Sequence, residues 1–140
     1  MTFIDTNVLV YAAADAAPLL DRARAAVARA GANGPVAISR QVLREYLSVM
    51  TRPQMWGKPL TLAQAVTDTA RFVRQFTILE DGPLVWDRLI MLSRRYSFAG
   101  RQVHDANIVA TMLAHGERRI LTFNGADFRR FARLIEVVAL

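Results

Sequence analysis

Short apolar runs alternate along the chain with longer segments in which apolar residues recur at helical spacing. The short runs predict strands over residues 2–4, 36–38, 77–79, 120–123 and 134–138. The longer segments predict helices over residues 8–14, 19–30, 40–51, 62–75, 83–96, 103–114 and 126–131. Strands separated by helices of ten or more residues need right-handed crossovers, so we expect a mainly parallel α/β sheet covered on both faces. No repeat or linker divides this pattern, and we expect one domain over residues 1–140.

Polar residues mark where the predicted helices begin. Asp5, Thr6 and Asn7 follow the first strand directly and readily cap a helix, and Ser39 and Thr61 precede later helices in the same way. In open parallel sheets, ligands bind beyond the carboxyl ends of the strands. The residues that directly follow each strand are therefore the first candidates for chemistry.

Large apolar residues at helical spacing are expected in the core. Phe72, Phe76, Trp86 and Met91 follow this pattern. Residues 53–59 contain two prolines and a glycine, which predicts a loop that either covers a site or only connects two helices.

Composition limits the class of protein. The chain has 140 residues, 53% hydrophobic and 21% charged, so it can bury a core. It has no cysteine, which excludes a disulfide framework and a thiolate zinc site. Asp5 and Asn7 interrupt the first apolar run, which also lacks a basic start, so we expect no secretory signal; no run is long enough to span a membrane. The cytoplasm is the expected location.

The net charge of +6 favours polyanionic partners such as nucleic acid. Lys58 is the only lysine, and arginine suits bidentate contacts with phosphate. The same bias toward arginine is equally expected from genome composition. Charge alone therefore does not decide the partner.

Two aspartates stand out by position. Asp5 follows the first strand, where it is expected either to cap a helix or to belong to a site. Asp105 has apolar residues at i+3, i+4, i+7 and i+8, which places its carboxylate at the centre of an apolar stripe. Burying a carboxylate costs several kcal/mol unless a cation or hydrogen-bond donors compensate. A buried functional or metal-binding role is therefore favoured over a plain helix cap for Asp105, and an ion pair with an arginine such as Arg101 is the best structural alternative.

Three further residues are weaker candidates. Glu45 lies beside the apolar face of its helix, where a glutamate usually reaches solvent or pairs with arginine. Asn124 follows the fourth strand, either as a site residue or as a turn residue before Gly125. Asp127 begins the next short helix, where it is either a cap or a site residue.

Oxygen-bearing side chains at one edge of a sheet indicate a hard divalent cation. Without cysteine, and with only His104 and His115 as nitrogen donors, Mg²⁺ or Mn²⁺ is the ion that suits these residues. Two isolated histidines carry little signal and are expected to make polar contacts.

Four segments along the whole chain contain the candidate residues. They are IDTNVLVY at 4–11, VLREY at 42–46, HDANIVA at 104–110, and LTFN at 121–124 leading to Asp127 and Phe128. In these segments and in their order, the chain resembles the PIN-domain family, and within it the VapC-type ribonucleases of bacterial toxin–antitoxin pairs.

The resemblance implies a three-layer α/β/α sandwich on a five-stranded, mainly parallel sheet. It also implies Mg²⁺-dependent hydrolysis of RNA phosphodiester bonds, with Mn²⁺ as the alternative ion, a homodimer, and inhibition by a cognate antitoxin protein. Asp5, Glu45 and Asp105 match the three acidic positions of the family, and Asn124 and Asp127 compete for the fourth.

The chemistry of phosphodiester cleavage agrees with these residues, since it needs cations and an activated water. We expect Asp5 and Asp105 to hold the metal, Glu45 to complete its shell or orient the water, and Asp127 to hold a second ion. Clustered carboxylates repel one another, which should raise some of their pKa values. Nearby polar side chains are expected to orient the waters bound to the metal, and they are Thr6, Asn7, Ser39, Thr122 and Asn124.

The sequence leaves two other functions open. A phosphatase of the haloacid dehalogenase type also begins with a strand and an aspartate, but that chemistry wants a second aspartate where Asn7 stands. A non-catalytic PIN-like module that binds RNA or protein is the other alternative, because an asparagine at 124 would weaken a second metal site.

Overall fold

The computed structural model describes residues 1–140 and contains one five-stranded sheet. The strand order is β3-β2-β1-β4-β5, and every neighbouring pair is parallel. The strands are β1 (Thr2–Ile4), β2 (Val36–Ser39), β3 (Thr77–Leu79), β4 (Arg119–Leu121) and β5 (Glu136–Val138). The predicted parallel α/β sheet is confirmed.

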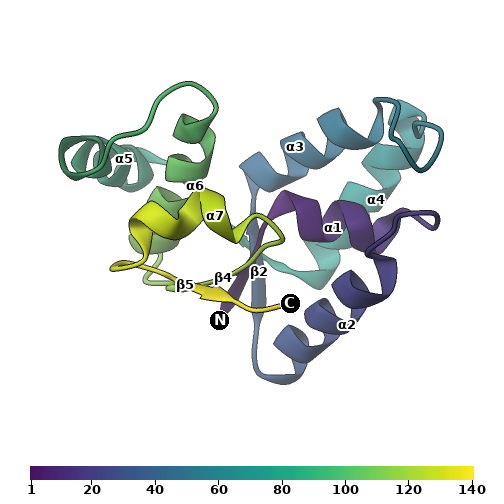
Figure 1. Ribbon diagram of the computed structural model, residues 1–140, viewed down its shortest axis with the longest axis horizontal. Helices are drawn as coiled ribbons and strands as arrows, with labels where there is room; N and C mark the ends of the chain where they lie inside the picture. Colours follow the sequence, from purple (N-terminus) through teal and green to yellow (C-terminus); the bar gives the residue numbers. More distant parts are fainter.

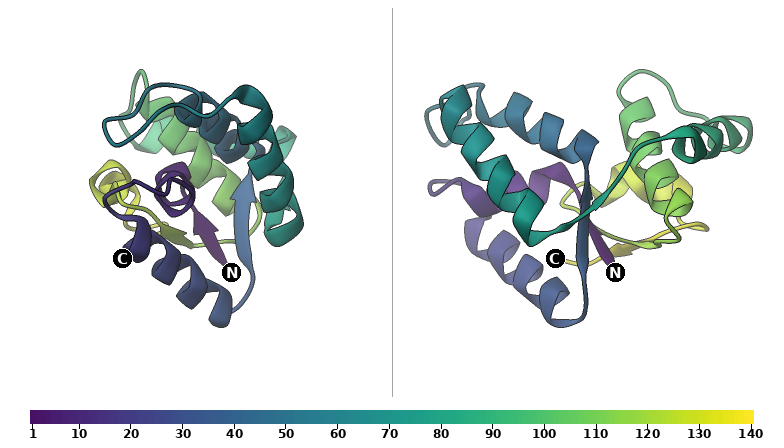
Figure 2. Two further views of the ribbon diagram at one scale, coloured as in Figure 1. Left: turned by 90° about the vertical axis from the view of Figure 1, so that its right-hand side faces the viewer. Right: turned by 180° about the vertical axis from the view of Figure 1, so that it is seen from behind.

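Helices cover both sides of this sheet, as Figure 1 shows. The helices are α1 (Thr6–Ala13), α2 (Leu20–Ala32), α3 (Arg40–Met50), α4 (Leu62–Gln75), α5 (Pro83–Arg95), α6 (Gln102–Ala114), α7 (Gly125–Phe128) and the 3₁₀ helix η1 (Arg129–Phe131). Helices α1 to α4 lie on one side and α5 to α7 on the other, which both ribbon views preserve (Figure 2). This is the expected α/β/α sandwich. No helix is long and apolar enough to cross a membrane.

The direction of the chain through the sheet reverses beside β1. The chain moves outward from β1 to β2 and β3, and then crosses to β4 and β5 on the other side of β1. Such a reversal opens a crevice at the carboxyl ends of the two strands that flank it. The residues after β1 and β4 therefore face a natural binding site.

Buried apolar side chains from both layers form the core. Phe3, Ile4, Ile38 and Ile120 of the three central strands are completely buried. The sequences of these strands are almost continuously apolar because both faces of a parallel sheet are covered.

Side chains cap the helices as predicted at three positions. Asp5 accepts from the Thr6 backbone N–H and Ser39 from that of Val42. Thr61 and Gln64 form a reciprocal capping box at the start of α4.

Two predicted strands are too long. The fourth was expected to reach residue 123 but ends at Leu121, because Thr122 and the backbone N–H of Phe123 bond to side chains of α1 and its cap. The last begins at Glu136 rather than residue 134, since Leu134 closes a turn onto Phe131.

The expectation that Trp86 lies in the core is wrong. Its side chain is 61% exposed, beside Leu84 at 69%. Helix α5 packs inward through Val85 and Leu92, which lie seven residues apart on one face, and Trp86 falls about 100° away from that face. Phe72 is buried as predicted.

Candidate active site

Asp5 lies where β1 ends and α1 begins, and its carboxylate accepts three hydrogen bonds. Oδ1 accepts from the Thr6 backbone N–H at 2.8 Å. Oδ2 accepts from the Thr122 hydroxyl at 2.7 Å and from the Asn7 amide at 3.3 Å. Three donors hold the carboxylate still, and none of them is a cation.

Asn7 joins the two strand ends around Asp5. Its amide N–H also donates to Thr122 Oγ1 at 3.2 Å, and its carbonyl oxygen accepts from the Phe123 backbone N–H at 3.1 Å. Thr122 Oγ1 in turn accepts from the Asn124 backbone N–H at 3.0 Å. The DTN segment after β1 is thus locked to the segment after β4.

Burial dominates the electrostatics of Asp5. Its side chain is almost fully buried, and desolvation raises its pKa from 3.8 to about 6, opposed by the bonds from Thr122 and Thr6. Glu45 and Asp127 raise the pKa further through charge repulsion. Asp5 therefore caps α1 and is also a carboxylate whose charged form is disfavoured by burial. The two roles expected from its sequence position, a helix cap and a site residue, are compatible.

Glu45 lies on α3 and reaches toward α1. Its Oε2 accepts from the Thr6 hydroxyl at 2.6 Å, and its Oε1 accepts from the Gln41 amide at 2.9 Å. It makes no ion pair with arginine, which was one of the two usual outcomes expected for this position.

Gln41 is a functional candidate that the sequence analysis missed. Its buried amide donates to Glu45 and to the His104 backbone carbonyl at 2.9 Å, and its carbonyl oxygen accepts from Asn107 at 2.9 Å. Gln41 thus fixes α3, with Glu45, against α6. The available signal was a glutamine four residues before Glu45 on a face whose neighbours, Val42 and Tyr46, are apolar.

Asp105 lies in the first turn of α6 and is half-buried. Desolvation raises its pKa to about 6, and the charges of Asp5, Asp127 and Glu45 add to that rise, while His104 lowers it. Arg101 makes no ion pair with Asp105, so the structural alternative is not observed.

The fourth position remains shared between Asn124 and Asp127. Both are exposed and line the same cavity, Asn124 as the residue before α7 and Asp127 within its first turn. Asp127 does not cap α7, since Asn124 holds the cap position. Of the two, Asp127 adds to the charge that Asp5 and Asp105 experience.

One cavity of about 630 Å³ collects these side chains. The four carboxylates of Asp5, Glu45, Asp105 and Asp127 all line it, together with Asn124. Ser39, expected to orient water, instead caps α3 and lies outside the cavity. The cavity continues to residues not anticipated as part of a site, which are Tyr11, Arg52, Gln54 and Trp56.

The donor set suits a hydrated Mg²⁺ ion better than a tightly caged metal. No three Asp, Glu or His side chains lie close enough to ligate one ion directly. Mg²⁺ usually keeps several waters and takes only one or two carboxylates, so an open ring of acidic oxygens fits it. Asp5 and Asp105 have raised pKa values, and a bound cation would lower them by stabilising the charged carboxylates.

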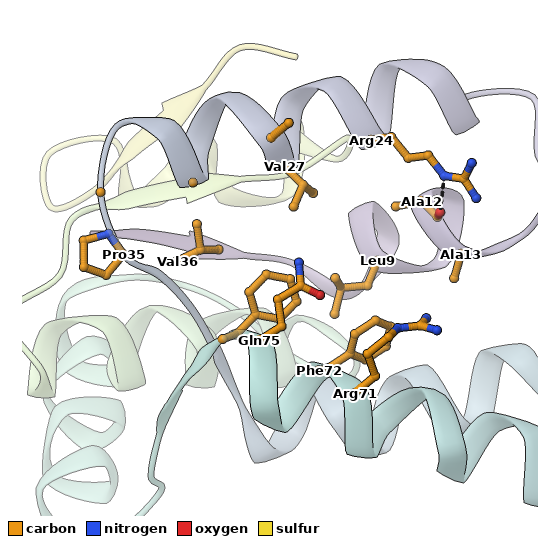
Figure 3. A pocket seen from close by; sticks show the side chains of 14 residues that line it. Leu9, Ala12, Ala13, Arg24, Val27, Pro35, Val36, Arg71, Phe72 and Gln75 are labelled. Carbon is orange, nitrogen blue, oxygen red and sulfur yellow. Dashed lines mark hydrogen bonds between the residues drawn. The ribbon is translucent and has the colours of Figure 1, made fainter.

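A second cavity, of about 530 Å³, has different chemistry. It lies between α2 and α4, with Leu9, Val36 and Phe72 in its walls and Arg24 and Arg71 at its edge (Figure 3). No acidic side chain lines it. Of these two cavities, only the first offers carboxylates that could hold a metal.

Comparison with known proteins identifies the family of the chain. The family model of the PIN domain matches residues 2–134. The chain belongs to the PIN-domain family. This PIN domain is 31% identical over 133 residues to Ribonuclease VapC24 of Mycobacterium tuberculosis (strain H37Rv), an alignment that covers 94% of this chain and 91% of that protein. The relationship places the PIN domain among the VapC-type members of the family.

Solved structures share the fold of this PIN domain. The sarcin-ricin-loop-cleaving toxin VapC20 of M. tuberculosis superposes with a TM-score of 0.70 at 20% identity, covering 99% of this chain and 100% of that one. A toxin–antitoxin complex from Klebsiella pneumoniae gives 0.64 at 21% identity, covering 99% and 97%. The expected PIN fold is confirmed.

Proposed function

We propose that this PIN domain is a Mg²⁺-dependent endoribonuclease and the toxin of a toxin–antitoxin pair. The observation that supports this function most directly is the set of carboxylates around one cavity, none of which forms an ion pair, although Arg52 and Arg101 also line the cavity. Such an arrangement is costly for stability and is expected where a cation binds. The relatives named ribonucleases supply the substrate class.

The residues of the chain would divide the work as follows. Asp5 and Asp105 would hold Mg²⁺, with Mn²⁺ as the alternative ion, and Asp127 a second one. A bound cation supplies charge neutralisation on the phosphoryl oxygens and lowers the pKa of water. Glu45 keeps acceptor capacity beyond its two hydrogen bonds, because a carboxylate has about four lone-pair sites, and it would take the proton of the attacking water.

Asp5→Asn and Asp105→Asn test this function. Each variant is expected to cleave single-stranded RNA at least about 100-fold more slowly than the wild type, since each removes a charge from the ion site. Mg²⁺ should raise the melting temperature of the wild type and not of Asp5→Asn, a readout independent of activity. Asp87→Asn, an exposed change on α5, is the matched control.

Equal cleavage by the wild type and both site variants would reject the proposed catalytic role of this site. Cleavage in excess EDTA would reject the proposed requirement for a metal ion. RNA binding without any cleavage would favour the non-catalytic module. A haloacid-dehalogenase-type phosphatase has no support here, because Asn7 occupies the place of its second aspartate.

The proposed toxin function implies an antitoxin as the protein partner. We propose a cognate antitoxin that docks an amphipathic segment in the cavity between α2 and α4 (Figure 3), in the cytoplasm. The apolar walls suit such a segment, and Arg24 and Arg71, in a chain of net charge +6, suit acidic side chains along it. Val27→Asp should weaken binding of the antitoxin encoded beside this chain and leave RNA cleavage unchanged; unchanged binding would reject the docking site.

A homodimer is also proposed, supported by the exposed apolar side chains of Leu84 and Trp86 on α5. Light scattering should give twice the chain mass of 15.6 kDa for the wild type and a lower mass for the Leu84→Asp, Trp86→Asp double variant. A wild-type monomer would reject it.

A further inference from the structure

The acidic cavity has a second end that the cleavage chemistry does not use. Helices α1 and α3 pack against each other and lead away from the sheet, from Asp5 and Glu45 to the loop that follows α3 (Figure 1). Along α1, Tyr11 lies six residues beyond Asp5, or about 9 Å of helix. Arg52 lies two residues beyond the end of α3 and lines the same cavity as Glu45.

Two aromatic rings stand at that far end. The rings of Tyr11 and Trp56 lie 5.3 Å apart between centroids, both are only partly buried, and both line the cavity. Phe123 packs edge-on against Tyr11 but does not line the cavity, and the Arg22 guanidinium lies over its ring. No arginine or lysine is stacked on Tyr11 or Trp56.

The loop that carries Trp56 is fastened to α3. The Gln54 amide donates to the Val49 carbonyl at 2.6 Å, and the backbones of Gln54 and Gly57 bond to each other in both directions. Leu60 N–H donates to the Met50 carbonyl at 2.8 Å. The aromatic wall is therefore held in place before any ligand arrives.

We propose that Tyr11 and Trp56 form a subsite for one unpaired base of the RNA, with Arg52 beside it to contact phosphate. This subsite rests on the ribonuclease function proposed above and adds to it the recognition of unpaired RNA. Bases stack on aromatic side chains without regard to sequence. The helical rise of about 9 Å from Asp5 to Tyr11 corresponds to two or three nucleotides, at about 3.4 Å of stacked strand each.

Fluorescence tests the subsite without catalysis. The chain has two tryptophans, so Trp86→Phe leaves Trp56 as the only one. In EDTA, a nucleoside 5′-monophosphate should quench the emission of this variant, and ribose 5-phosphate should not. Equal responses to the two compounds, or no response to either, would overturn the proposal.

Cleavage of RNA oligomers with one abasic position tests its use in the reaction. The wild type should lose about 5- to 150-fold in rate when the missing base lies two or three nucleotides from the cleaved bond. Trp56→Ala should cleave intact RNA more slowly by a similar factor and no longer respond to the missing base, and Trp56→Phe should retain most of the effect.

One result would assign Trp56 a purely structural role. It is a Trp56→Ala variant that responds to the abasic position as strongly as the wild type does, so that the substitution slows cleavage of intact and abasic RNA by the same factor. If the wild type cleaves no RNA at all, the proposed ribonuclease function fails, and the fluorescence result still decides whether a base binds.

Discussion

The acidic cavity and the apolar cavity lie in the same small domain but affect its stability in opposite directions. In the first, Asp5 is buried with neutral donors only, and desolvation raises its pKa to about 6, so its charged form is disfavoured. In the second, Phe72 and its apolar neighbours bury surface that stabilises the fold. The comparison indicates that apolar packing such as that of α4 on α3, through Phe72 and Tyr46, stabilises the domain, while the buried carboxylates weaken it in favour of cation binding.

Phe72→Ala should have the largest effect on stability. The ring is 5% exposed and packs edge-on against Tyr46 at 4.9 Å, so its loss should lower the free energy of unfolding by about 3–5 kcal/mol. Urea denaturation measures the change. Leu62→Ala, an exposed change on the same helix, should cost less than about 0.5 kcal/mol. Similar losses in the two variants would contradict the role given to this packing.

The acidic cavity should make the protein less stable as pH rises. For Asp5 the folded pKa of about 6 exceeds the unfolded value of 3.8, so between these values the native state binds more protons than the unfolded state. The free energy of unfolding should then fall by up to about 3 kcal/mol between pH 4 and pH 7 on account of Asp5, and change little above pH 7. Asp105 shifts in the same direction.

Denaturation at a series of pH values in EDTA measures this effect. Asp5→Asn, which keeps a capping oxygen for the Thr6 N–H, should show a flatter profile and gain on the wild type as pH rises. Parallel profiles for the two proteins would show that Asp5 carries no such cost.

Gln41→Leu should have a smaller effect on stability and a specific effect on activity. It removes the bonds to Glu45, to the His104 carbonyl and to Asn107, which should cost about 1–2 kcal/mol. Because Glu45 then loses one of its two donors, RNA cleavage should slow about tenfold, a loss of about 1.4 kcal/mol in the barrier.

The same substitution in the apolar cavity is the control. Gln75 lines that cavity, is exposed and makes no side-chain hydrogen bond, so Gln75→Leu should leave both stability and cleavage near the wild-type values. Equal rates for Gln41→Leu and the wild type would show that Gln41 only joins two helices.

Local patterns predicted most of the fold and failed where tertiary contacts compete with them. Residues 122 and 123 continue an apolar strand pattern, but the hydroxyl of Thr122 and the N–H of Phe123 bond to Asp5 and Asn7 instead. Trp86 repeats at helical spacing, but the inward face of α5 is narrow enough for Val85 and Leu92 to fill. Neither outcome can be predicted from one segment, because the competing partner comes from another.

The sequence alone determined the parallel α/β architecture, the helix caps at Asp5, Ser39 and Thr61, and the acidic residues worth testing, because periodicity and capping depend on neighbours in the chain. Only the tertiary structure decided that Glu45 bonds to Thr6 and Gln41 rather than to arginine, and that Asp105 is left without a counter-ion. It also brought Trp56 beside Tyr11 at the far end of the cavity. Hydrogen-bond partners, desolvation and the shape of a cavity depend on distances between segments remote in sequence, and these distances exist only once the helices pack on the sheet.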